Sequence, residues 1–235
     1  MNFRSFGSSS KGNCYLVESD GVAPLLLECG IPIKRIRERL DFGLSGLAGC
    51  LVSHEHGDHS KAIKDLLKAG VDCWMSEGTA KALGVENHHR INLTEKDKGF
   101  MVGPWRVGHF PLEHDAAQPE GFYIEGPDYV TLLFIPDTAF VKSRFLGVNI
   151  LAIEANNIEE ILSRNIVEGN IPAVVGRRVR RSHMSLERVI AMLKANDLSR
   201  CREIHLLHLS DGNSDENEMR RRVQEATGIA TYIAS

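Results

Sequence analysis

The feature that most constrains this sequence is a cluster of three histidines and one aspartate, namely His54, His56, Asp58 and His59. The cluster directly follows the apolar run GCLVS. On an α-helix, residues two positions apart point about 160° away from each other, so His54 and His56 can share a metal ion only from a loop. Imidazole and carboxylate groups together suit zinc, manganese or iron. The sequence therefore predicts a metal centre in a loop at the end of a strand.

The segments on either side of this cluster alternate between strand and helix patterns. Short apolar runs bounded by turn residues predict strands over 2–6, 14–19, 25–28, 49–53, 71–76 and 90–93. Apolar residues at helical spacing predict helices over 32–43, 59–70 and 77–84.

A second β-rich stretch follows, with strands expected over 100–102, 105–112, 121–125, 129–137, 148–155 and 203–210. Helices are expected over 157–165, 185–197 and 217–227. Two β-rich stretches, each followed by helices, imply an α/β fold in which two sheets pack face to face with helices outside. Because no linker, low-complexity tract or repeat divides the chain, we expect one domain over 1–235.

Composition limits the cellular setting. A chain of 235 residues with 43% hydrophobic and 25% charged residues can bury one large core. No apolar run reaches the roughly 18 residues of a membrane span, and the N-terminus lacks a signal-peptide pattern. We therefore expect a cytoplasmic protein without a membrane partner. The five cysteines form no CxxC pair, which favours reduced core residues over disulfides or a structural zinc site.

The cluster of predicted metal ligands resembles a motif of a known family. HEHGDH resembles the HxHxDH motif of the metallo-β-lactamase superfamily, and its position after a strand and before a helix is similar. Within that superfamily, five further segments resemble the WalJ/YycJ-like nucleases: SSSKGNCYLVE, LLLECG, HDAAQPEGFYI, HMS and LLHLSDGNSDE. The resemblance implies a four-layer αββα sandwich with the metal site at the sheet edge.

The resemblance also implies a ligand set for two divalent metal ions, Zn²⁺ or Mn²⁺. It places the first ion on His54, His56 and His114, the second on Asp58, His59 and His208, and Asp137 between them as a bridge. The residues themselves support the three remote ligands, because each lies at or just past the end of a predicted strand. His109 and His205 lie inside predicted strands and are the fallback ligands.

Two positions depart from the pattern that the resemblance implies. Glu28 stands where the superfamily usually has aspartate, and we expect it to orient ligands by hydrogen bonds. Met184 stands where the nuclease branch usually has leucine, which conserves volume.

The implied reaction is hydrolysis. Two divalent ions about 3.5–4 Å apart lower the pKa of a shared water to about 7, and the bridging hydroxide is the nucleophile. Asp58 would both bind a metal and steer the hydroxide's proton. A phosphodiester also needs a proton for its leaving alkoxide and cations for its phosphate oxygens. The resemblance places His183 beside the scissile phosphate, as proton donor or phosphate ligand.

Several further residues are expected to bind substrate. Just before His183, a cluster of guanidinium groups offers a polyanion an electrostatic track: Arg177, Arg178, Arg180 and Arg181. In the turn over 8–13, Ser10 and Asn13 can lend polar groups to phosphate, although the same pattern is typical of an ordinary hairpin turn.

The most specific function that these features predict is a DNA exonuclease, and the preference for DNA rests on the resemblance alone. RNA and a small cyclic phosphodiester stay open as substrates, and the oligomeric state stays open as well. A glyoxalase II-type thioester or ester hydrolase is the alternative enzyme, since it uses the same two-metal ligands. A non-catalytic module that binds nucleic acid through the arginines is the alternative outside enzymes.

Overall fold

The computed structural model of the protein describes residues 1–41 and 43–235. Its contacts divide the chain into two compact units. Unit 1 comprises the described residues of Met1–Pro111 and Ala116–Thr131 together with Ser235, and unit 2 comprises Leu112–Asp115 and Leu132–Ala234. The single domain over 1–235 stays a prediction.

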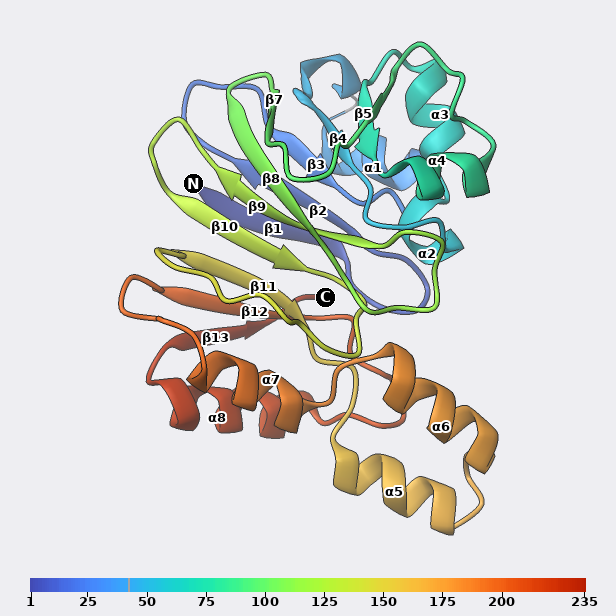
Figure 1. Ribbon diagram of the computed structural model, residues 1–235, viewed down its shortest axis with the longest axis vertical. Coiled ribbons are helices and arrows are strands. Elements are labelled where there is room, and N and C mark those ends of the chain that lie inside the picture. Colours follow the sequence, from blue (N-terminus) through green and yellow to red (C-terminus); the bar gives the residue numbers. More distant parts are fainter. Residues whose placement is uncertain (42) are drawn as a thin grey trace. The chain divides into compact units, whose positions relative to one another are not determined.

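Unit 1 contains a six-stranded sheet with its strands in sequence order (Figure 1). The strands are β1 (Asn2–Gly7), β2 (Cys14–Glu18), β3 (Leu25–Leu27), β4 (Gly49–Leu51), β5 (Cys73–Met75) and β6 (Ile91–Leu93). The first three pair antiparallel, and β3 to β6 pair parallel. Strands β2, β3 and β4 are almost wholly buried, as strands covered on both faces are.

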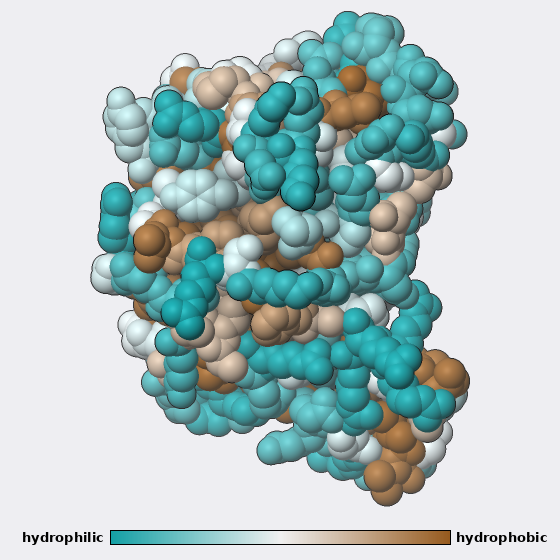
Figure 2. All heavy atoms as spheres, viewed as in Figure 1, coloured by the Kyte–Doolittle hydropathy of each residue, from teal (hydrophilic) through white to brown (hydrophobic). Residues whose placement is uncertain are grey.

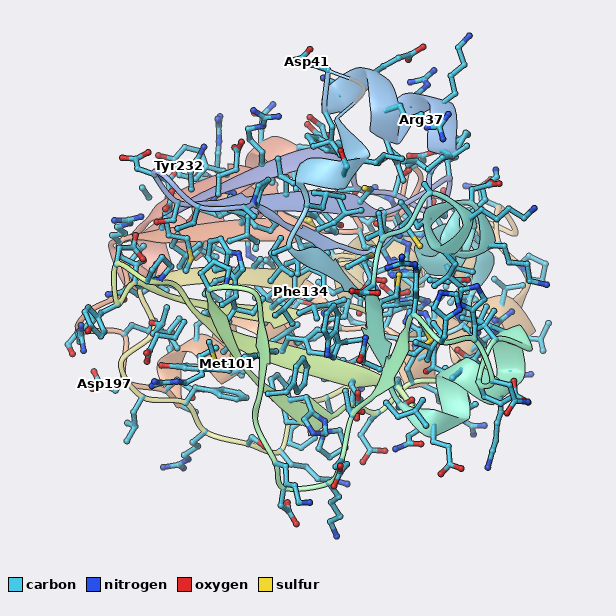
Figure 3. The ribbon with its side chains drawn as sticks, turned by 90° about the horizontal axis from the view of Figure 1, so that it is seen from above. Arg37, Asp41, Met101, Phe134, Asp197 and Tyr232 are labelled. Atoms are coloured by element: carbon cyan, nitrogen blue, oxygen red, sulfur yellow. The ribbon has the colours of Figure 1, made fainter. Side chains whose placement is uncertain are left out.

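The helices of unit 1 are α1 (Ile33–Arg39), the 3-10 helix η1 (Leu44–Gly46), α2 (Gly57–Ser60), α3 (Ile63–Lys68) and α4 (Glu77–Leu83). Figure 3 shows Arg37 of α1 pointing outward, while Ile36 of the same helix is buried in the core. The helix expected over 59–70 is divided into α2 and α3. Phe42, part of the helix expected over 32–43, lies outside the described residues.

The cysteines of unit 1 belong to the core, as the sequence predicts. Four of them are buried and free: Cys14, Cys29, Cys50 and Cys73. Unit 1 also contains three antiparallel strands, β7 (Phe100–Val102), β8 (Trp105–Pro111) and β9 (Glu120–Glu125).

Unit 2 is built on parallel strands: β10 (Thr131–Ile135), β11 (Ile150–Glu154), β12 (Glu203–Leu207) and β13 (Ala230–Ile233). Every residue of β10 and β11 is buried. Figure 3 shows Phe134 of β10 in the interior and Tyr232 of β13 at the periphery. The parallel strands end at one edge, so residues that follow them come together there.

The helices of unit 2 are α5 (Glu159–Val167), α6 (Ala173–Ser182), α7 (Leu186–Lys194) and α8 (Glu216–Thr227). The sequence patterns predicted neither α6 nor β13. Helix α6 buries only Gly176 and Ser182, and its second half is dominated by the four arginines. None of the helices in the described part of the chain is long and apolar enough to span a membrane.

Helices α5 and α6 lie side by side in a hairpin (Figure 1). A Cβ on Gly176 would lie 2.2 Å from Ile166 Cδ1, so glycine is what allows this close approach. Figure 2 shows apolar side chains gathered on the hairpin, where Val167 and Val174 are exposed.

The segment over 54–59, which contains the predicted metal ligands and is called the metal loop below, packs closely against Gly30 in unit 1. A Cβ on Gly30 would lie 1.6 Å from the main-chain oxygen of Asp58. That oxygen accepts a hydrogen bond from Asn13 N at 2.7 Å, and Cys29 N donates to His59 O at 2.8 Å. The segment after β3 thus fixes the backbone of Asp58 and His59.

We expect Gly30→Ala to destabilise the protein, because the added methyl group meets backbone that cannot move aside. Overpacking of this kind typically costs about 1–3 kcal/mol. Urea unfolding measures the effect, and Gly46→Ala is the matched control, since nothing lies within 4 Å of a Cβ at Gly46. The control should stay within about 0.5 kcal/mol of the parent. Equal stability of the two variants would contradict the proposed packing of the metal loop.

Candidate metal centre

His54 and His56 lie in the loop between β4 and α2, as the sequence predicts, and His59 lies within α2. His56 is the N-cap of α2 and has extended backbone angles, φ −56° and ψ 143°. The ring centroids of His54 and His56 are 4.7 Å apart, and those of His54 and His59 are 4.1 Å apart. His54 is buried, and its Nδ1 lies 2.8 Å from Ser53 Oγ. Three imidazoles therefore converge within unit 1.

Asn13 lies inside unit 1 against this loop, rather than in an exposed turn. Its side chain is buried, and its Nδ2 lies 3.1 Å from His59 Nε2 and 3.4 Å from Asp58 Oδ2. Tyr15 donates its hydroxyl to Asn13 Oδ1 at 3.1 Å, which sets the orientation of the amide. Ser10, the other residue expected to bind phosphate from this turn, is exposed.

Glu28 lies directly behind His59. Its carboxylate is buried, with Oε2 at 3.7 Å from His59 Nδ1, and Ser53 N donates to Oε1 at 3.3 Å. The backbone of Glu28 is left-handed, with φ 61°, an uncommon conformation for a residue with a side chain. A carboxylate on the far nitrogen of a ligand histidine is the arrangement that orients metal-binding imidazoles.

The three remote ligands predicted from the sequence belong to unit 2, where they lie close together. Asp137 follows β10 and is buried, and its Oδ1 lies 2.7 Å from His208 Nδ1. His208 follows β12 with a left-handed backbone, φ 54°. His114 Nε2 lies 3.8 Å from Asp137 Oδ2.

The surroundings of His114 favour its neutral form. Its Nδ1 donates to the main-chain oxygen of Ser182 at 2.7 Å, which leaves the lone pair of the neutral ring on Nε2. Burial is the main cause that lowers the pKa of His114 below its usual value, and the nearby Asp137 charge only partly opposes this. The neutral imidazole is the form that binds a metal.

Glu154 is a site residue that the sequence analysis missed. It ends β11 and is fully buried, and its Oε2 accepts hydrogen bonds from Thr138 N at 2.8 Å and Met184 N at 3.2 Å. Its Oε1 accepts from His183 Nδ1 at 2.5 Å and lies 3.4 Å from His208 Nδ1. The available signal was an acidic residue at the end of a buried strand, the same signal that identified Asp137.

His183 lies just after α6, where it is the C-cap residue. Burial alone would lower the pKa of His183, but the negative charge of Glu154 and the hydrogen bond to it outweigh burial, so the pKa lies above its usual value. Asp137 adds to the effect, with Oδ2 at 3.7 Å from His183 Nδ1. The pair therefore favours a protonated imidazole.

The arginines lie on a helix, α6, which the sequence patterns did not predict. Arg178 Nε pairs with Asp115 at 3.0 Å, and Arg180 Nε pairs with Glu159 at 2.9 Å. Arg177 and Arg181 are exposed and lie one helical turn apart. Two of the four guanidinium groups thus already have carboxylate partners.

The fallback histidines have other partners. His109 Nδ1 lies 2.8 Å from Glu120 Oε1, and its ring contacts the main-chain oxygen of Glu95 at 3.0 Å. His205 stacks on Tyr232 with ring centroids 5.2 Å apart. Neither residue belongs to any of the groups of potential metal ligands found among residues 1–41 and 43–235.

The donor sets fit divalent metal ions. In unit 2, Asp137 Oδ1 lies 2.7 Å from His208 Nδ1, and Asp137 Oδ2 lies 3.8 Å from His114 Nε2. In unit 1, His54 and His56 lie together, as do Asp58 and His59. Nitrogen and oxygen donors without cysteine suit a catalytic zinc or manganese site better than a structural zinc site.

The similarities to known proteins include residues of both units. A family model described as a beta-lactamase superfamily domain matches residues 31–206. The exodeoxyribonuclease YycJ of Bacillus anthracis is 27% identical over 243 residues, which cover 96% of this chain and 88% of the relative.

Two solved structures resemble the whole chain. The metallo-β-lactamase fold protein YhfI from Bacillus subtilis has a TM-score of 0.73 at 15% identity, covering 99% of this chain and 96% of its own. Zn²⁺-bound PqqB from Methylobacterium extorquens has a TM-score of 0.68 at 14% identity, covering 100% of this chain and 97% of its own. These similarities confirm the predicted fold class.

We expect Glu154→Gln to lower the pKa of His183, because the substitution removes the negative charge that favours the protonated ring. NMR titration of isotope-labelled imidazoles, with chelator present, measures this pKa directly. Glu203→Gln is the matched control, since Glu203 lies 3.5 Å from His205 instead. An unchanged pKa of His183 in Glu154→Gln would show that the pair does not control its protonation.

Proposed function

The chain belongs to the β-lactamase superfamily and is a hydrolase of the metallo-β-lactamase fold, and on that premise we propose that it hydrolyses the phosphodiester bonds of DNA as an exonuclease. The observation that carries the proposal is the contact between His183 and Glu154, which favours a protonated imidazole close to Asp137. A reaction with a poor leaving group needs such a proton donor.

The proposal assigns divalent metal ions to the ligands that the resemblance implies. These ligands are His54, His56, His114, Asp58, His59, His208 and Asp137. When bound, the ions supply an activated water and neutralise the charge of the phosphate. Glu28 orients His59 from its Nδ1 side.

His183 donates the proton that distinguishes the proposed phosphodiester hydrolysis from thioester hydrolysis. As the bond from phosphorus to the leaving oxygen breaks, the alkoxide takes the proton from His183, and Glu154 stabilises the charged ring beforehand. A thiolate leaves without a proton, so a glyoxalase II-type enzyme has little use for a histidine with a raised pKa. The pair in unit 2 therefore favours a phosphodiesterase over that alternative.

The choice of DNA rests on the relative from Bacillus anthracis, which is named an exodeoxyribonuclease. The four arginines of α6 contribute unequally to the proposed binding of a polyanion. Arg178 and Arg180 pair with Asp115 and Glu159, so the attraction for phosphate comes mainly from Arg177 and Arg181.

We expect His183→Ala to slow hydrolysis of linear DNA by about 10²–10⁴, the range for removal of a general acid, and to leave the metal content unchanged. The effect should be smaller on bis(p-nitrophenyl) phosphate, because p-nitrophenolate leaves without a proton. Kinetics on both substrates, with elemental analysis, provide the measurement.

His109→Ala is the control for His183→Ala, since His109 also pairs with a glutamate but lies in unit 1, outside the proposed ligand set. It should keep the parental rates. Equally slowed hydrolysis of both substrates by His183→Ala would assign His183 to phosphate binding rather than to proton donation.

We expect the double variant Arg177→Ala, Arg181→Ala to bind duplex DNA more weakly and with a flatter salt dependence. For each phosphate that the protein no longer neutralises, the slope of log K against log salt changes by about 0.9. Arg35 and Arg39 are exposed at the same spacing on α1, so their double alanine variant is the matched control. If both double variants show the parental slope, the α6 arginines do not contact the substrate.

A further inference from the structure

A pocket of about 500 Å³ lies in unit 2, and its lining includes Met184, the residue that follows His183. Its walls come from the segment over 140–144 and from one side of α7, and Met184 forms part of it. Met184 directly follows His183, and its main-chain N–H donates to Glu154. The pocket is thus connected to the proposed proton donor through the backbone, one residue along the chain, and its volume lies within the roughly 300–1,000 Å³ of small-molecule sites.

The floor of the pocket is apolar and adaptable. Val141, Met184 and Met192 supply aliphatic and thioether surface, and Ala191 and Ala195 leave room above α7. Methionine adapts its shape to flat rings and interacts favourably with them. Such a floor suits a planar heterocycle better than a charged group.

The rim of the pocket adds an aromatic ring and positive charge. Phe140 is 56% exposed, an unusual position for a phenylalanine and one from which its ring can stack on a bound base. Lys142, Arg144 and Arg188 also line the pocket. Lys142 pairs with Glu113, while Arg188 donates to the main-chain oxygens of Ala139 and Arg180 at 3.1 and 2.9 Å, which fixes its guanidinium.

An apolar floor, an aromatic rim residue and guanidinium groups together complement one ligand class, a nucleobase that carries a phosphate. We infer that this pocket binds a nucleobase of the nucleic-acid substrate. The inference rests on the proposed function, which makes the substrate a nucleic acid. It assigns the pocket a part in placing the nucleic-acid chain end.

Ligand binding to the intact protein tests the inference without relying on activity. Deoxyadenosine 5′-monophosphate and deoxyribose 5-phosphate share their sugar and phosphate, so their difference in affinity reports the base. By calorimetry, the parent protein should bind the nucleotide at least tenfold more tightly. Ala191→Trp places an indole in the pocket from an exposed helix position and should abolish this preference while keeping the affinity for deoxyribose 5-phosphate.

Ala82→Trp makes the same change at an exposed position of α4 and should keep the full preference. Equal affinity of the parent for the two ligands would overturn the inference even if Ala191→Trp failed to fold, and so would a preference that survives in a folded Ala191→Trp. If the preference is found but the parent does not hydrolyse DNA, the proposed function fails while the pocket stands as a nucleotide site.

Discussion

The geometry of the proposed metal ligands in unit 2 depends on one buried carboxylate, that of Glu154. A fully buried charge is costly unless hydrogen bonds compensate it, and this carboxylate accepts from two main-chain N–H groups and from His183. The groups that donate these hydrogen bonds to Glu154 lie in the turn after β10 and at the junction of α6 with α7. These two segments are far apart in the sequence. Satisfying the charge of Glu154 therefore also fixes the segments that hold Asp137 and His183.

The protonation states in unit 2 follow from the same contacts. His183 and His114 have rings 5.2 Å apart, yet their pKa values move in opposite directions. His183 has a carboxylate on its Nδ1, whereas His114 has a neutral main-chain oxygen there. One histidine is thereby suited to give a proton and the other to bind a metal, although both are largely buried.

Site residues could be predicted from the sequence where a local pattern identifies them. They could not be predicted where their role depends on contacts with residues far away in the sequence. The motif from His54 to His59 could be interpreted because its ligands are close in sequence, and Asp137 and His208 because each follows a strand. Glu154 was missed because it lies inside the strand expected over 148–155, and its partner His183 lies 29 positions away. Asn13 fits a turn by its neighbours, but its buried contact is with Asp58, 45 positions away.

The central claim is that this chain hydrolyses phosphodiester bonds of DNA in a metal-dependent way. The most direct measurement digests linear duplex DNA in H₂¹⁸O, after removal of metals and again after addition of Mn²⁺ or Zn²⁺, with mass spectrometry of the products. The account predicts no digestion without metal and, with it, deoxynucleoside monophosphates that each carry one ¹⁸O atom from water. Intact DNA at every metal concentration, together with hydrolysis of a thioester by the same protein, would contradict it.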